Sequence, residues 1–155
     1  MTAFSIPISD PPANVLAVNL SWEDHEFLRG IFQTAGWHLQ RAPTIETVLQ
    51  FMERAVLPVL ICEVQLPDGL WSALLRRAER FPRPPRLVVA SRLADERLWA
   101  EVLNLGGFDV LSTPFEASEV RHVVAHAWES WHGQWKSVSG NRPAASPSRV
   151  MPAFA

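Results

Sequence analysis

Short apolar runs alternate along this chain with segments in which apolar residues recur every three or four positions. The runs predict buried strands, and the recurring pattern predicts helices with one apolar face. The predicted strands cover residues 14–20, 37–42, 57–66, 86–91 and 108–112. The third is apolar nearly throughout, which is typical of a strand covered on both faces in a parallel sheet.

A predicted helix follows each strand, and the ends of the first two carry capping residues. Ser21 and Thr44 precede these helices as N-caps, Asp24 is a weaker capping-box partner of Ser21, and Gly36 ends the first helix. The predicted core-facing positions are Phe27, Leu28, Ile31, Phe32 and Ala35; Ile45, Val48, Leu49, Met52 and Val56; Trp71, Leu74, Leu75 and Ala78; Leu98, Trp99, Val102, Leu103 and Leu105; and Val120, Val123, Val124, Ala127, Trp128, Trp131 and Trp135. Five strand–helix units in succession predict an α/β fold, a doubly wound five-stranded parallel sheet with five helices.

One domain with two tails accounts for the length of 155 residues. Residues 1–13 contain three prolines and little periodic pattern, and they predict an extended lead-in. Residues 137–155 are rich in Ser, Pro, Ala and Gly, a composition that predicts disorder. The folded domain is therefore expected to span residues 14–136.

Composition excludes several classes of protein. With 14 basic and 16 acidic residues, the net charge of -2 gives no electrostatic footprint of a nucleic-acid binder. The single cysteine, Cys62, cannot form an internal disulfide, and its apolar neighbours predict an inert, buried thiol. No stretch is long enough to cross a membrane and no signal-peptide pattern opens the chain, so we expect a cytoplasmic protein. We find no motif for a cofactor.

Three local patterns, in their order and spacing, are similar to those of a known family. They are EVQLPDG at 63–69, LNLGGFDVLSTPF at 103–115, and the spacing from Asn19 to Gly36. Together with the five strand–helix units, they make residues 14–131 resemble the receiver domain of bacterial response regulators. The resemblance implies a flavodoxin-like fold and a place in two-component signal transduction or a phosphorelay.

The resemblance also implies where phosphorylation chemistry would lie. A working receiver has an acid pair and a phosphoacceptor Asp that hold Mg²⁺, a hydroxyl residue, and a Lys that neutralises phosphoryl charge. In this chain the acid pair falls on Asn19 and Leu20, the acceptor on Glu63, the hydroxyl on Ser91 or Ala90, the Lys on Thr113, and an aromatic switch residue on Val110. One carboxylate, one amide and two hydroxyls would hold Mg²⁺ weakly. We therefore expect a degenerate site with no catalytic residue, no metal and no aspartyl phosphate.

Glu63 has two interpretations at this stage. Its carboxylate could imitate a phosphorylated aspartate and hold the domain in one conformation. It could equally be an acid tolerated at a solvated strand end. The missing lysine and aromatic switch favour the second interpretation.

Aromatic residues on the last helices are the candidate partner-binding residues. Two interpretations stay open: Trp131 and Trp135 project past the body of the domain as a patch with Trp128 and with Trp99 of the preceding helix, or neighbouring loops cover them while Trp128 completes the core. Tryptophan is a favoured anchor at protein interfaces. His122 and His126 share one face of the last helix at metal-ligand spacing, but no third ligand is evident, which favours a solvated face.

The sequence therefore predicts a stand-alone, phosphorylation-independent module that binds a signalling protein, either a histidine kinase or a downstream target, or itself. A homodimer would use the fourth and fifth helices. Too few residues follow the last helix for a DNA-binding unit. Two alternatives stay open: a small-molecule-binding domain that uses the vacated pocket, and a divergent but active phosphoreceiver.

Overall fold

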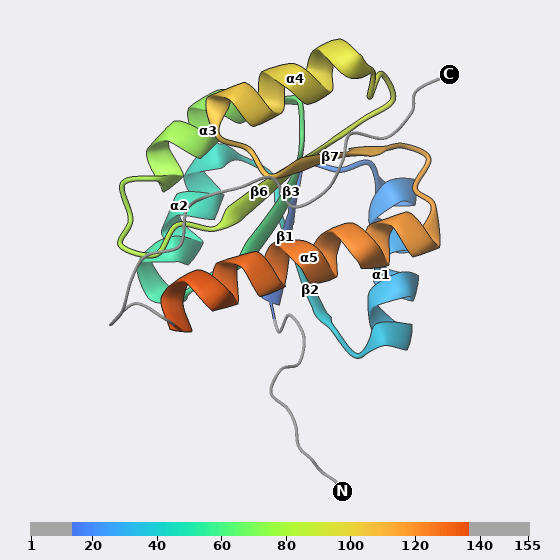
Figure 1. The fold of residues 1–155 in the computed structure, drawn as a ribbon, viewed down its shortest axis with the longest axis horizontal. Coiled ribbons are helices and arrows are strands. Elements are labelled where there is room, and N and C mark those ends of the chain that lie inside the picture. The colour runs from blue at the N-terminus through green and yellow to red at the C-terminus, as the bar shows by residue number, and fades with distance from the viewer. Residues whose placement is uncertain (1–13, 137–155) are drawn as a thin grey trace, which may run out of the picture.

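A five-stranded parallel sheet forms the centre of the domain (Figure 1). The computed structural model describes residues 14–136, so the predicted lead-in and tail lie outside the described residues. The strands are β1 Asn14–Val18, β2 His38–Ala42, β3 Val59–Glu63, β6 Arg86–Ser91 and β7 Asp109–Ser112, in the spatial order β2-β1-β3-β6-β7. Every neighbouring pair is parallel. The predicted doubly wound α/β fold is confirmed.

Helices cover both faces of the sheet and bury two separate apolar clusters. The helices are α1 Trp22–Ala35, α2 Ile45–Arg54, α3 Trp71–Ala78, α4 Glu96–Leu105 and α5 Ala117–Lys136. Helices α1 and α5 pack on one face, against side chains such as Val15, Ile61 and Val88. Helices α2, α3 and α4 pack on the other, against Leu16 and Val89 among others. Alternate residues of each strand thus face opposite cores, which explains the apolar runs in the sequence.

The predicted helix caps are present. Ser21 Oγ accepts a hydrogen bond from the Asp24 amide at 3.1 Å, and Thr44 Oγ1 accepts one from the Thr47 amide at 3.1 Å. Gly36 has φ 78°, the left-handed conformation that glycine adopts without a Cβ penalty. Helices α1 and α2 therefore begin after the N-caps that the sequence indicates, and α1 ends at the predicted glycine.

The third strand is shorter than predicted. It ends at Glu63 rather than at residue 66, and a small antiparallel hairpin follows, made of β4 Gln65–Leu66 and β5 Gly69–Leu70. The Pro67–Asp68 turn folds the chain back, and the Trp71 amide then donates to the Val64 carbonyl at 2.9 Å. The sequence did not reveal where β3 ends, because the largely apolar run continues to Leu66 and strands of two residues are too short to show a periodic pattern.

Three predicted core positions were wrong. Phe27 is 48% exposed on the outer side of α1, whereas His25, which the pattern passed over, is buried. Val56 lies beyond the end of α2 and is 44% exposed, and Leu105, the last residue of α4, is 52% exposed. Helical spacing alone cannot tell the edge or the end of an apolar face from its centre. In the described part of the chain, no helix has the length and apolar character needed to cross a membrane.

Candidate functional site

The carboxyl ends of the strands bring most of the predicted site positions to one edge of the sheet. Asn19 directly follows β1, and Glu63 ends β3. Glu63 is level with Ala90 in the ladder between β3 and β6, and the Thr113 amide donates to the Ser91 carbonyl at 3.0 Å. In parallel α/β sheets this edge is where ligands and functional side chains gather.

The register distinguishes the two residues considered for the hydroxyl position. Ala90 is the direct neighbour of Glu63, so a methyl group stands beside that carboxylate. Ser91 is one residue further on, paired with Ser112, and its Oγ accepts a hydrogen bond from the Leu93 amide at 3.0 Å. The Ser91 hydroxyl is thus engaged with its own loop.

Neither acid-pair position holds a carboxylate, and the residues present make other contacts. Asn19 has φ 58°, a left-handed conformation that asparagine tolerates better than most residues, and its Nδ2 donates to the Gln65 carbonyl at 3.4 Å. Leu20 is only 7% exposed and packs into the cluster under α1 and α5. Leu20, on which the second acid position falls, therefore packs in the core and presents no ligand atom to the site.

The lysine and switch positions are also filled by buried side chains. Thr113, before the cis peptide bond to Pro114, is buried and carries no charge. Val110 is buried in the cluster under α2, α3 and α4. A branched aliphatic side chain enclosed in this way cannot swing between inner and outer positions as a surface aromatic can.

Glu63 sits in an electrostatic setting that the sequence did not indicate. Its side chain is half-buried, and this burial raises the pKa of the carboxyl group above its ordinary value. Repulsion from the Asp24 carboxylate acts in the same direction, while attraction to the Arg92 guanidinium opposes both. The site thus holds two carboxylates and one cation, which corrects the count of a single carboxylate. The sequence analysis did not select Asp24 or Arg92. Asp24 lies in the first turn of α1 and Arg92 directly follows β6, and this position after a strand was the feature that could have identified them.

Metal-ligand geometry is lacking in residues 14–136, where no three His, Cys, Asp or Glu side chains lie together as a metal site would require. The His122 and His126 rings on α5 are 5.6 Å apart between centroids and meet edge to face. His126 also meets the Phe108 ring edge to face at 6.1 Å. This pair therefore forms part of an aromatic surface with Phe108.

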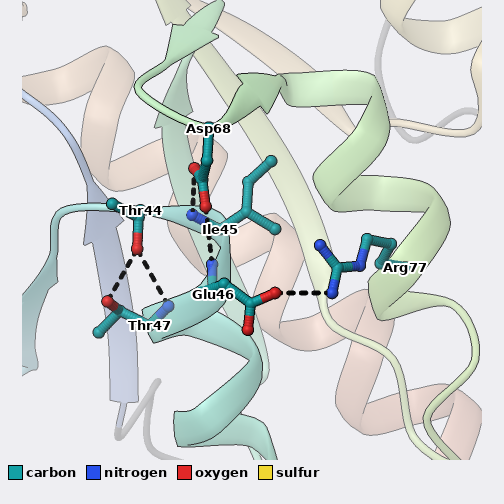
Figure 2. Close-up of polar contacts among 6 residues, drawn as sticks. All are labelled: Thr44, Ile45, Glu46, Thr47, Asp68 and Arg77. Carbon is teal, nitrogen blue, oxygen red and sulfur yellow. Dashed lines mark hydrogen bonds and ion pairs between the residues drawn. The ribbon is translucent and has the colours of Figure 1, made fainter.

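Asp68 joins the hairpin after β3 to the start of α2 (Figure 2). Its carboxylate accepts hydrogen bonds from the Ile45 amide at 2.9 Å and from the Glu46 amide at 3.2 Å. With the Thr44 cap on Thr47, the first three amides of α2 all have acceptors, as a stable helix start requires. Partial burial acts to raise the pKa of Asp68, but these backbone hydrogen bonds outweigh it and hold the pKa below its ordinary value.

The structure distinguishes the two interpretations of the α5 tryptophans. Trp131 is 6% exposed, and the Arg83 guanidinium lies 4.7 Å from its ring centroid and 5.6 Å from that of Trp135. Trp128 is half-buried and stacks on His132, with 4.5 Å between ring centroids. Trp131 and Trp135 do not project past the domain as the first interpretation had it, because an arginine of the α3–β6 loop packs over both rings. Trp99 is also half-buried, against the core under α4.

The tryptophan with the greatest exposure is one that the sequence analysis did not select. Trp22, at the start of α1, is 63% exposed, and the Arg41 guanidinium lies 5.5 Å from its ring centroid. Burial first, and then the Arg41 charge, lower the pKa of the neighbouring His25.

Cys62 is fully buried as predicted, and burial raises the pKa of its thiol far above its ordinary value, so it is not a reactive residue.

Comparison with known proteins agrees with this architecture. No family model matches the sequence, and no curated protein matches it. A protein described as a response regulator from Chloroflexus aurantiacus is 26% identical, over 74% of this chain and 99% of that one, with a TM-score of 0.65. The signal receiver domain of an HD domain-containing protein from Pseudomonas fluorescens is 19% identical, over 86% and 98%, with a TM-score of 0.73. The beryllofluoride-activated NtrC4 receiver domain dimer is 19% identical, over 76% and 98%, with a TM-score of 0.69.

The strand order, the helices on both faces and the position of the site define an α/β protein of the flavodoxin-like class. Within that class, this chain is a receiver-like domain, with the fold of response-regulator receivers.

Proposed function

We propose that this chain is a signalling module of the two-component type that works by binding another protein, without phosphorylation and without catalysis. The observation that carries the proposal is the filling of the site. Leu20 is packed into the core where the resemblance implies a metal-binding acid, and Thr113 is buried where it implies a lysine. Neither side chain can supply the charge that the chemistry needs.

The charges that remain do not replace the missing ones. Phosphoryl transfer to a carboxylate needs cations that neutralise the developing charge on the phosphoryl oxygens. Asp24 adds a second negative charge near Glu63, and Arg92 is the opposing charge acting on that carboxylate. Mg²⁺ releases its water ligands reluctantly, and two carboxylates of which one resists ionisation favour it less than a full acid cluster.

The test is to incubate the full chain with a small-molecule phosphodonor and Mg²⁺ and to follow its intact mass. We expect no gain in mass, while an active receiver domain treated in parallel gains a labile phosphoryl group. A labile gain that disappears in Glu63→Gln would contradict the proposal and would instead support an active, divergent phosphoreceiver.

The surface proposed for partner binding or self-association is the face formed by α4, β7 and α5. Leu105, at the end of α4, is 52% exposed, and Phe108, three residues further along the chain, is half-buried. His122 is exposed on α5 and adjoins His126, which meets Phe108. Exposed leucine and aromatic side chains are the kind of residues that the centre of an interface buries. Because Trp131 is buried, Leu105 replaces it as the proposed anchor, with Trp99 and Trp128 as half-buried support.

A fixed charge at Glu63 is a second candidate mechanism for this module. It is favoured by Arg92, whose charge acts on the Glu63 carboxylate and provides a responder that the sequence analysis lacked. If this attraction between the two charges holds the β6–α4 loop in one conformation, Glu63→Gln should weaken binding of a partner that recognises α4. Unchanged affinity in that variant, with Glu53→Gln as a control for loss of charge, would dismiss the mechanism.

A further inference from the structure

Two strongly exposed apolar side chains flank Glu63 at the carboxyl edge of the sheet. Trp22, in the first turn of α1, is 63% exposed, and Leu93, in the loop between β6 and α4, is 77% exposed. Their elements follow β1 and β6, the strands on either side of β3, which ends at Glu63. Figure 1 shows the starts of α1 and α4 at the same end of the sheet, on the right of the view. Large apolar side chains gathered at one edge of a domain are typical of an interaction surface.

Both side chains are held in place by contacts of the chain around them. The Leu93 amide donates to Ser91 Oγ at 3.0 Å, and the Leu93 carbonyl accepts from the Asp95 amide at 2.9 Å. Asp95 in turn caps the start of α4. Trp22 begins α1, and the Arg41 guanidinium lies 5.5 Å from its ring centroid. A partner would therefore meet two side chains that are already in position, which lowers the entropy cost of binding.

The carboxylate between these side chains has a charge that its neighbours only partly offset. Partial burial, and then the charge of Asp24 in the same turn as Trp22, raise the pKa of Glu63. Arg92 opposes both effects without cancelling them. Thr113, which is buried and uncharged, takes the place where the family resemblance implies a lysine. The site therefore has room in its charge balance for a cation that another molecule brings.

We propose that this edge binds a peptide segment of another protein in which a lysine or arginine is flanked by apolar side chains. The cation lies beside Glu63 and Asp24, and the apolar side chains cover Trp22 and Leu93. The inference rests on the proposed function, because a site that accepts no phosphoryl group is free for this use. It adds a second binding surface to the α4–β7–α5 face.

Charge and spacing both favour a segment of this kind. An acidic segment would meet two carboxylates, and a purely apolar one would cover the Glu63 charge without giving it a partner, which is costly. Neighbouring strands lie about 4.8 Å apart, so β1 and β6, with β3 between them, are separated by about 10 Å. An extended chain spans this distance in about three residues. A basic residue with apolar neighbours one or two positions away on each side therefore fits the edge.

The test selects binders of the full chain from a display library of random short peptides. We expect the enriched peptides to share a lysine or arginine with apolar neighbours. Synthetic copies should bind the full chain, and replacing the basic residue by norleucine should weaken binding by about tenfold. Enrichment of acidic peptides, or of apolar peptides without a basic residue, would overturn the proposal. Failure to enrich any peptide would do the same.

Variants of the domain locate the bound peptide. Trp22→Ala and Leu93→Ala should each weaken binding by about tenfold, as loss of an interface anchor does. Phe27→Ala is a matched control on the outer side of α1, and Leu105→Ala is one on the α4–β7–α5 face; both residues are about as exposed as interface anchors are, and neither change should alter the affinity. Unchanged affinity in Trp22→Ala and Leu93→Ala, or a loss in Leu105→Ala instead, would place the peptide elsewhere and refute the proposal.

Glu63→Gln tests the role of the charge. It should weaken peptide binding by about tenfold, whereas Glu53→Gln, at an exposed carboxylate near the end of α2, should not. Unchanged affinity in Glu63→Gln would show that the cation lies elsewhere, against the proposal. The phosphodonor measurement keeps the two proposals apart. No gain in mass together with no such peptide removes this inference alone, while a labile gain in mass removes the proposed function whatever the peptides bind.

Discussion

Glu63 is the residue whose chemistry depends most on its neighbours. Half-burial disfavours its charged form, and the Asp24 carboxylate adds to the effect, so the folded domain binds a proton here more tightly than the unfolded chain does. Ionising Glu63 therefore costs folding free energy. The sign follows directly: this group takes stability away as pH rises from its ordinary pKa of 4.5 through the raised folded value.

Glu63→Gln should accordingly stabilise the domain at neutral pH, because the amide never carries the disfavoured charge. Below the ordinary carboxyl pKa, where Glu63 is protonated in both states, the two proteins should unfold at nearly the same temperature. Thermal unfolding at the two pH values measures the difference. Glu129→Gln, which changes an exposed carboxylate of α5, should shift neither curve. A Glu63→Gln variant less stable at neutral pH would contradict the assignment.

Asp68→Ala should remove the acceptors of the first two amides of α2 and lower the free energy of unfolding by about 1 kcal/mol, as loss of a capping side chain does. Urea denaturation at neutral pH measures the loss. Because hydrogen bonds hold the pKa of Asp68 low, its stabilisation should persist above the ordinary carboxyl pKa and fade as pH falls through the lower folded value. Asp68→Asn keeps one acceptor oxygen and should lose less than Asp68→Ala; an equal loss would argue against the cap.

At this scale the sequence predicted the positions of site residues better than their surroundings. Asn19, Glu63 and Thr113 lie at strand ends where counting placed them, because strand length and capping residues determine that position. The burial of Leu20 was not predicted, because a residue after a strand can turn either to solvent or to the core, and its apolar side chain decided the outcome. Asp24 and Arg92 were missed because charges from separate loops meet only in three dimensions.

At the scale of an element, helix α5 also has a position that was predicted from the sequence and surroundings that were not. Its apolar stripe was predicted correctly, and its 20 residues run from Ala117 to Lys136. The position of its last turns was not, because it depends on arginines from outside the helix. Arg83 covers two of the tryptophans, and Arg86 of β6 donates to Ser130 Oγ at 3.0 Å and to the Gln134 side chain.

Arg86→Ala should loosen these last turns without unfolding the sheet. Three groups of the helix, on Ser130 and Gln134, would lose their charged donor, at a cost of roughly 1–3 kcal/mol. Hydrogen exchange should accelerate for the amides of residues 130–136 and stay unchanged in β3. Arg80→Ala, at an exposed arginine after α3, is the control and should alter neither region. Equal acceleration throughout the domain would show that Arg86 supports the whole fold instead.

At the scale of the whole molecule, alternation of strands and helices was sufficient to predict the sheet, its parallel strands and its two covered faces. Short connections and right-handed crossovers leave few other arrangements for five such units. The β4–β5 hairpin escaped prediction because Gln65–Leu66 follow the apolar run of β3 without a break, and the contact of Asp68 with α2 that helps to hold the hairpin forms only in three dimensions.

Self-association belongs to this scale as well. If the face of α4, β7 and α5 joins two copies, sedimentation at increasing concentration should show a dimer, and Leu105→Asp should return it to monomer by burying a charge in the apolar centre. Leu70→Asp is the matched control, since Leu70 is 50% exposed on the hairpin on another side of the domain. Loss of the dimer in both variants, or in the control alone, would remove this face as the interface.

Two hydrogen bonds from amides of α2 to the Asp68 carboxylate couple this helix to the hairpin that follows β3. These hydrogen bonds couple residues 65–70 to the first turn of α2, so a protein that binds α2 and displaces it would also displace the end of β3, where Glu63 lies. By thermodynamic reciprocity, a ligand that binds at the end of β3 would change the affinity of α2 for its partner by the same factor. If the domain acts without phosphorylation, as proposed, this contact would still couple the end of β3 to a neighbouring helix.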